Sequence, residues 1–148
     1  MTQGVIDLRE ATGFPGMKIL GFAFDSKEEN DYLPHTYTKN CVVYTGTHDN
    51  DTLIGWFTKA NEDDKQFARD YLNSRSDDEI HWDAIRGAWS SVANMAIAPI
   101  QDFLGLGSEA RINTPGLASG NWQWRLKEGV LTDELAERIA KLTKVYSR

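Results

Sequence analysis

Apolar residues gather in three short runs along the chain, at residues 17–24, 42–44 and 95–100. Short apolar runs without polar alternation are typical of strands that are buried on both faces, as in a parallel sheet. Pro99 lacks a backbone N–H, so it fits only the end of the third run or an unpaired position in it. The pattern therefore predicts three strands of a parallel sheet.

The segments between and around these runs show helical periodicity or are rich in turn-forming residues. Gly13 and Pro15 stop a first helix, and Thr132 gives the last one a capping-type start. Residues 25–40 combine mixed charge with turn formers, which indicates a loop. We expect the end of a helix at residues 6–11 and further helices at 52–57, 63–72, 78–91 and 132–145.

The order of these elements is that of an α/β fold, with no internal repeat and no linker that would mark a second domain. The chain has 148 residues, whereas a complete α/β barrel typically needs roughly 250. Three strands cannot close a barrel, and they leave two open edges and uncovered apolar surface. We therefore expect one domain or a piece of one.

A polar, acid-rich turn follows the second strand. Residues 44–52 read Tyr-Thr-Gly-Thr-His-Asp-Asn-Asp-Thr, and an amphipathic segment comes directly after them. In α/β folds, the loops that follow the carboxyl ends of the strands carry the chemistry. His48 and Asp49 are therefore candidate site residues. On residue types alone, the alternative is an Asx-rich helix start with Asp49 or Asn50 as N-cap.

Composition narrows the class of partner. The net charge is −6, and no cluster of Lys and Arg offers a surface for a nucleic-acid backbone or an anionic membrane. A neutral or cationic ligand fits better.

Cys41 is the single cysteine, which excludes an internal disulfide and makes the cytoplasm the expected location. No apolar run approaches a membrane span, and residues 1–10 lack the features of a signal peptide.

The five tryptophans fall into two groups. Trp56, Trp82 and Trp89 lie on helical patterns and are expected to pack in the core or to line a groove. Trp122 and Trp124 follow a turn rich in Pro, Gly and Ser, beside amides and an arginine. Flat rings in such surroundings also suit sugar binding, which makes Trp122 a candidate substrate-binding residue.

Five sequence blocks carry a resemblance to a known family. They are Gly-Phe-Pro-Gly-Met-Lys-Ile-Leu at 13–20 with Phe-Ala-Phe-Asp at 22–25, the polar turn at 44–52, Gln-Asp-Phe-Leu-Gly-Leu-Gly at 101–107, Arg-Ile-Asn-Thr-Pro-Gly at 111–116, and Gly-Asn-Trp-Gln-Trp-Arg at 120–125. In this order they resemble the 4-α-glucanotransferases, also called amylomaltases or disproportionating enzymes. The resemblance runs from about Val5 to the C-terminus.

The resemblance implies a (β/α)8 barrel, of which residues 1–148 would form a single C-terminal fragment, about the last three strand-helix units. In this family the Asp of the Thr-His-Asp block stabilises the transition state, and the His binds sugar in the reactive subsite. The matching residues are Asp49 and His48, and Asn113 matches an amide near bound sugar. The implied substrate is an α-1,4-glucan or maltooligosaccharide, whose segments are transferred to the 4-hydroxyl of an acceptor by a retaining mechanism. No cofactor and no metal are implied.

The same resemblance implies an incomplete catalytic site. The family's nucleophilic Asp and general-acid Glu lie on earlier strands than those of this chain. Retaining transfer needs two carboxyl groups roughly 5 Å apart across the scissile bond. We therefore expect the chain alone to be inactive, and Asp49 not to act as the nucleophile.

Two other functions compete with glucan transfer. The first is that of a non-catalytic fragment that binds oligosaccharide weakly and self-associates as a homo-oligomer through its exposed barrel edges. The second is hydrolysis by an amylase, because transfer and hydrolysis differ in how well water is kept from the intermediate.

Overall fold

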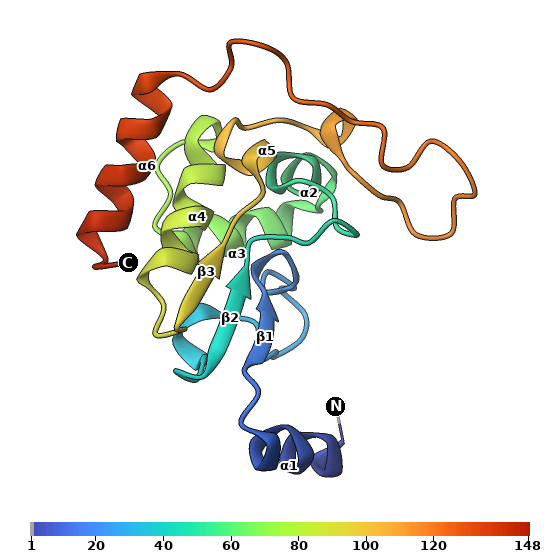
Figure 1. Ribbon diagram of the computed structural model, residues 1–148, viewed down its shortest axis with the longest axis vertical. Coiled ribbons are helices and arrows are strands. Elements are labelled where there is room, and N and C mark those ends of the chain that lie inside the picture. The colour runs from blue at the N-terminus through green and yellow to red at the C-terminus, as the bar shows by residue number, and fades with distance from the viewer. Residues whose placement is uncertain (1) are drawn as a thin grey trace.

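The computed structural model describes residues 2–148. Within that range the chain forms three short strands, six α-helices and four 3-10 turns (Figure 1). In chain order these are α1 (Gln3–Thr12), β1 (Gly16–Ile19), η1 (Leu20–Phe22), η2 (Pro34–Thr36), β2 (Cys41–Tyr44), α2 (Leu53–Lys59), α3 (Glu62–Leu72), η3 (Asp77–Glu79), α4 (Ile80–Ser90), β3 (Met95–Ile97), α5 (Ile100–Phe103), η4 (Ser108–Ala110) and α6 (Asp133–Val145).

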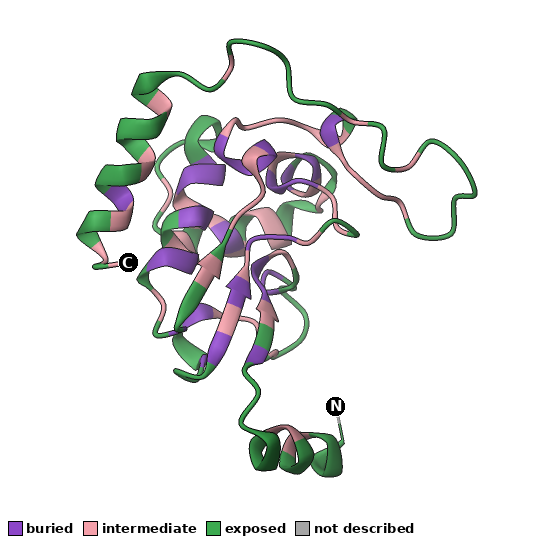
Figure 2. Ribbon diagram, viewed as in Figure 1, coloured by how far each residue is buried: buried purple, intermediate pink, exposed green. Residues whose placement is uncertain are grey.

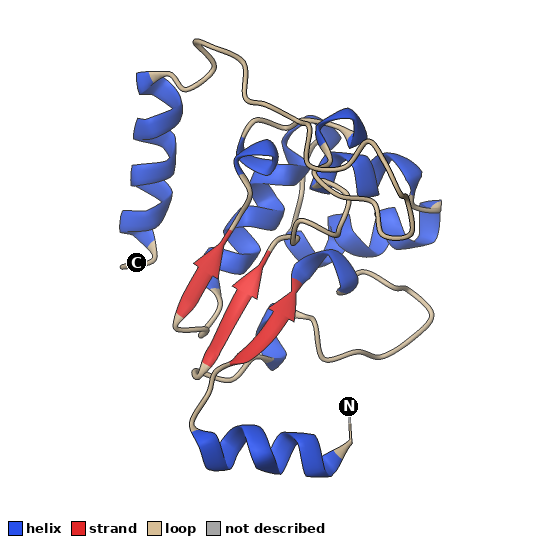
Figure 3. Ribbon diagram, turned by 45° about the vertical axis from the view of Figure 1, so that its right-hand side comes forward, coloured by secondary structure: helices blue, strands red, loops and turns tan. Residues whose placement is uncertain are grey.

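The strands form one parallel sheet in the order β1-β2-β3, as the sequence predicts. Helices α2, α3 and α4 lie together on one side of this sheet (Figures 1 and 3). Cys41 and Val43 of the central strand are buried there and belong to the same apolar cluster as Ile85 of α4. Burial raises the pKa of the Cys41 thiol. Cys41 thus acts as a small buried hydrophobe in the core.

The opposite face of the sheet has no helix over it within the described residues (Figure 3). Met17, Val42 and Met95 form one row across the three strands on this face. The Met17 and Met95 residues are 57% and 54% exposed. Figure 2 accordingly shows exposed residues on both β1 and β3, while β2 is only buried or intermediate. An apolar sheet face is thus left in contact with solvent.

The first strand is shorter than predicted. The apolar run covers residues 17–24, but β1 ends at Ile19 and the chain continues as the 3-10 turn η1. Beyond the strand, the Gly21 N–H donates to the carbonyl oxygen of Thr45 at 3.0 Å. The backbone therefore coils against the end of β2. Leu20, Ala23 and Phe24 are buried there without being part of the strand, whereas Phe22 is 49% exposed.

The third strand is also shorter than its apolar run, because Pro99 lies at the N-cap position of α5. A proline has no N–H to donate to a sheet but fits the start of a helix. The strand therefore ends at Ile97. The predicted helix over residues 78–91 likewise begins as the separate 3-10 turn η3 before α4 starts.

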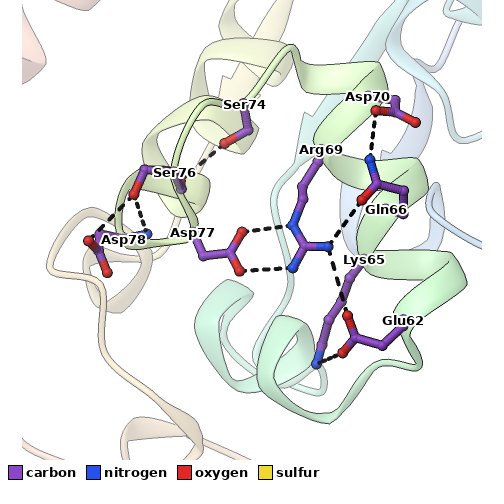
Figure 4. Close-up of polar contacts among 9 residues, drawn as sticks. All are labelled: Glu62, Lys65, Gln66, Arg69, Asp70, Ser74, Ser76, Asp77 and Asp78. Carbon is purple, nitrogen blue, oxygen red and sulfur yellow. Dashed lines mark hydrogen bonds and ion pairs between the residues drawn. The ribbon is translucent and has the colours of Figure 1, made fainter.

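Surface ion pairs connect α3 with the turn that precedes α4 (Figure 4). Arg69 donates from Nε and Nη2 to the two carboxylate oxygens of Asp77, each at 2.8 Å. Lys65 pairs with Glu62 at 2.8 Å on the same helix. Exposed pairs of this kind contribute little to stability. Of these pairs, Arg69–Asp77 joins α3 to the start of η3.

After η4 the chain leaves the body as a long loop over residues 111–132, and α6 then returns against α4 (Figure 1). The indole N–H of Trp89 donates to Thr143 Oγ1 at 3.2 Å. Arg148 donates to the backbone carbonyl oxygens of Trp89, Ser91 and Ala93 at 2.7 to 2.8 Å. The three Arg148 bonds satisfy carbonyl oxygens at and just after the C-terminal end of α4, where a helix leaves its last carbonyl groups without an intrahelical partner.

The tryptophans predicted to pack in the core do so. Trp82 and Trp89 are buried, and Trp56 is partly buried against the same cluster. Within residues 2–148, no helix has the length and apolar character needed to cross a membrane.

Candidate functional site

The predicted site residues lie beyond the carboxyl ends of the strands. β2 runs into residues 45–52, and the Thr45 N–H donates to the carbonyl oxygen of Ile97 at the end of β3, at 3.1 Å. Since β2 and β3 are parallel and adjacent, the segments that follow them leave from the same edge of the sheet. This places the polar turn beside the chain that follows α5.

Local hydrogen bonds give the polar turn its shape. Asn50 Oδ1 accepts from the Thr47 backbone N–H at 2.9 Å and from the Thr47 hydroxyl at 2.7 Å. The N-cap of α2 is Thr52, whose hydroxyl accepts from the Gly55 N–H at 3.0 Å. The alternative in which Asp49 or Asn50 caps the helix is therefore wrong. The Asp49 carboxylate is not used by the helix and projects from the turn.

Asp49, His48 and Asn113 meet although the chain separates them widely. Asn113 Nδ2 donates to Asp49 Oδ1 at 2.5 Å, across 64 positions of sequence. His48 Nε2 lies 3.4 Å from the same oxygen. The Asn113 backbone N–H donates to the His48 carbonyl oxygen at 3.1 Å, so the two segments are also joined through their backbones.

Trp122 completes this group. Its indole ring lies 5.0 Å from the His48 ring, centroid to centroid, at an interplanar angle of 39°. Its backbone has φ 64°, which is unusual for a large side chain, and its N–H donates to the Ile112 carbonyl oxygen at 2.7 Å. The residue is nevertheless 57% exposed. An exposed indole held in a strained backbone conformation presents a flat apolar surface beside a carboxylate, an imidazole and an amide.

Arg111 also belongs to the site, although it was not among the predicted site residues. Its Nη2 donates to the Asp49 carbonyl oxygen at 2.6 Å, and its Nε donates to the Asn113 carbonyl oxygen at 2.8 Å. The only sequence signal for it is its place at the start of the block at 111–116.

Asp51 is close in sequence to Asp49 but differs from it in its surroundings. It accepts from Lys59 Nζ at 2.6 Å, from Ser108 Oγ at 2.8 Å and from the Thr52 N–H at 2.9 Å. Burial alone would raise the pKa of this carboxyl, but these donors together hold it below its usual value. Asp51 thus fastens the turn to α2 and η4.

A second carboxylate lies beneath the turn. Asp102 is 2% exposed, accepts from the Thr45 hydroxyl at 2.6 Å, and accepts from the Leu53 N–H at 2.8 Å. Burial raises its pKa. From α5 this side chain holds both ends of the segment that carries His48 and Asp49.

The site is an open surface and not a closed pocket. The side chains of His48 and Asp49 are 53% and 49% exposed. The larger hollows of the described surface lie elsewhere, among them one of about 780 Å³ along α6. In this open setting the Asp49 carboxylate is well solvated. Its electrostatic effect on a ligand would grow if another surface covered it and excluded water.

The fold and the site together define a class: an α/β protein with a carboxylate, an imidazole, an amide and an exposed indole gathered at the carboxyl edge of a parallel sheet. The profile of the 4-alpha-glucanotransferase family matches residues 1–132. The chain belongs to this family.

Relatives and solved structures agree with this family. The chain is 50% identical to the 4-alpha-glucanotransferase of Clostridium butyricum and 51% identical to that of Synechocystis, over its full length in both. It spans 31% and 30% of those proteins, so about a third of their length. Its structure is similar to that of an amylomaltase from Streptococcus agalactiae in complex with acarbose, with TM-score 0.95 at 34% identity over all of this chain and 30% of that one. An amylomaltase from Corynebacterium glutamicum shares the fold, with TM-score 0.68 at 16% identity, over 97% of this chain and 27% of that one.

Proposed function

We propose that this chain supplies one side of the active site of a 4-α-glucanotransferase, which moves α-1,4-glucan segments to the 4-hydroxyl of an acceptor glucan or glucose. The observation that carries the proposal is the meeting of His48, Asp49 and Asn113 from two distant segments, in a chain that belongs to this family. The Asp49–Asn113 bond of 2.5 Å fixes the carboxylate without neutralising it.

The proposed role of Asp49 follows from the charge that develops during the reaction. The sugar ring passes through a transition state with oxocarbenium character, and a fixed carboxylate lowers its energy. Oδ1 of Asp49 is held by Asn113, while Oδ2 accepts no hydrogen bond from the described residues and is left for the hydroxyls of a sugar. His48 and Asn113 would hydrogen-bond to the same sugar, and the Trp122 ring would pack against its apolar face.

We further propose that the chain is the C-terminal part of a barrel whose nucleophile and general acid lie outside it, so that it is inactive alone. The nearby acids support this proposal. Asp51 is engaged by Lys59 and Ser108, and Asp102 is buried beneath the turn. Neither is placed to act with Asp49 as a pair of carboxyl groups across a bond, which a retaining reaction requires.

The test is a chimera in which this chain replaces the matching segment of the Clostridium butyricum relative, assayed for disproportionation of maltotriose. We expect transfer by the chimera and a fall in kcat of about 10²- to 10³-fold in Asp49→Asn, because one stabiliser of the transition-state charge is lost. Asp63→Asn makes the same change at an exposed position on α3 and is expected to leave kcat unchanged.

Two results would count against the proposal. Equal activity of the Asp49→Asn and parent chimeras would show that Asp49 takes no part in the reaction. Glucose release from maltotriose by the 148-residue chain itself would show that it is not an incomplete site. Mixing the chain with a separately made N-terminal part provides the complementary assay, in which restored activity supports the assignment of this chain as a C-terminal half.

A non-catalytic, self-associating fragment is the second candidate function. The observation in its favour is the uncovered sheet face around Met17 and Met95. It differs from the first proposal in one readout, since a fragment of this kind would bind maltooligosaccharide but would not restore transfer in the chimera.

A further inference from the structure

The guanidinium group of Arg111 binds backbone groups and not a carboxylate. It forms no ion pair with any described carboxylate, although Asp49 is its neighbour. Its two hydrogen bonds go instead to backbone carbonyl oxygens, those of Asp49 and Asn113. These are the two residues whose side chains meet at 2.5 Å.

The geometry of the guanidinium group suits this task. Nε and Nη2 lie on one edge of a planar group and donate in parallel directions, so one arginine can hold two acceptors at a fixed spacing. A lysine ammonium is a single point charge on a flexible stem and cannot reproduce both directions. Because Arg111 and Asp49 are 62 positions apart, the bond between them closes the site across the fold.

The same contact reaches Trp122. Ile112, which lies between Arg111 and Asn113, accepts the Trp122 N–H at 2.7 Å. The Arg111 backbone N–H in turn donates to Ser108 at 3.1 Å, which anchors the segment on η4. Arg111 thus holds Asp49 and Asn113 directly, His48 is the neighbour of Asp49, and Trp122 is bonded to Ile112, the neighbour of Asn113.

We propose that Arg111 is a positioning residue that sets the distance between the Asp49 carboxylate and the Asn113 amide. It touches neither the proposed sugar nor the reacting atoms, and it acts through the backbone of the residues that do. Its effect on catalysis rests on the proposed function, whereas its effect on geometry does not.

The geometric part is tested on the 148-residue chain by NMR. A side-chain amide that donates to a carboxylate has one strongly deshielded proton, so the two Asn113 Nδ2 protons should be widely separated in the native chain. In Arg111→Lys we expect this separation to collapse to the value seen in Asp49→Asn, where the carboxylate is absent. Circular dichroism should show the same helix content in all three proteins.

Arg148→Lys is the matched control. The guanidinium group of Arg148 also donates only to backbone carbonyl oxygens. These belong to Trp89, Ser91 and Ala93, at and just after the C-terminal end of α4. Its substitution should leave the Asn113 signals unchanged. An unchanged separation in Arg111→Lys overturns the proposal, and so does loss of the whole fold in that variant, because a positioning residue leaves the fold intact.

The catalytic part is tested in the chimera. Arg111→Lys should lower kcat by about 10- to 100-fold, because small displacements of positioned groups cost rate. The KM for maltotriose should change less than kcat, and the unfolding midpoint should stay close to that of the parent. An inactive parent chimera would contradict the proposed function. The NMR result alone would then test whether Arg111 positions Asp49 and Asn113. An active parent with unchanged kcat in Arg111→Lys overturns the positioning role.

Discussion

Asp102 is the buried acid of this chain, and its ionisation opposes folding. Burial raises its pKa, so the folded state holds a proton there at pH values where the unfolded chain has lost it. The free energy of unfolding contributed by this residue therefore rises as the pH falls through the folded-state pKa toward the unfolded value. The bonds from Thr45 and Leu53 reduce the effect of burial but do not reverse it.

Asp102→Asn should remove this pH dependence. The amide keeps an acceptor for the Leu53 N–H, and the Thr45 hydroxyl can accept from its NH2 group. We expect the stability of the variant relative to the native chain to be greatest at neutral pH and to decrease on acidification, measured by urea unfolding at several pH values. A stability difference that does not change with pH would contradict this assignment.

The sequence predicts some of the site residues and not others. Asp49 and Asn113 could be named because they lie in recognisable blocks, and the structure brings them into contact. Arg111 and Asp102 also lie in recognisable blocks, yet residue type alone does not show which backbone groups they bind. Those partners are 62 and 49 positions away, and only the packed fold determines them. The catalytic roles of all of these residues remain predictions.

Helix α2 packs so closely against its neighbours that one of its positions allows no side chain. A Cβ atom at Gly55 would lie 2.6 Å from Ser108 Oγ and closer still to the Asp51 carboxylate. These two groups are hydrogen-bonded to each other, so neither can move away without breaking the contact between the polar turn and η4.

Gly55→Ala should therefore destabilise the protein by about 1–3 kcal/mol, the usual cost of overpacking, even though alanine favours helices. Gly4→Ala is the control, because Gly4 lies in α1 with no atom within 4 Å of an added Cβ. We expect it to leave stability unchanged or slightly increased in thermal unfolding. Equal stability of Gly55→Ala and the native chain would mean that α2 is free to shift.

At the level of elements, hydrophobic pattern predicts which strands and helices exist better than it predicts where they end. The run at 17–24 is mostly apolar because Ile19, Leu20, Ala23 and Phe24 are buried, although only its first part joins the sheet. Burial and sheet pairing are different properties, and a mostly apolar run does not show where the strand ends. Pro99 is more informative, since its missing N–H correctly restricts where β3 can continue.

The whole molecule exposes one apolar face of its only described sheet. We expect the isolated chain to self-associate through this face, because Met17, Val42 and Met95 form a continuous row across it. The double variant Met17→Lys and Met95→Lys should be monomeric in sedimentation velocity at high micromolar concentration, whereas the native chain should not.

Leu131→Lys is the control for this experiment, since Leu131 is 61% exposed but lies in the loop before α6. It should associate like the native chain. A native chain that sediments as a compact monomer at the same concentration would show that the sheet face needs no cover.

The bond between Asp49 and Asn113 also has a consequence for the order in which the protein is made. A ribosome adds about 5–20 residues per second, and 64 positions separate the two residues. The carboxylate therefore leaves the ribosome roughly 3 to 13 seconds before the amide that holds it. During that interval β2 and α2 can form, but the Asp49 carboxylate lacks its hydrogen bond from Asn113. The contact between Asp49 and Asn113 thus cannot form until residue 113 has been made, after β2 and α2 are complete.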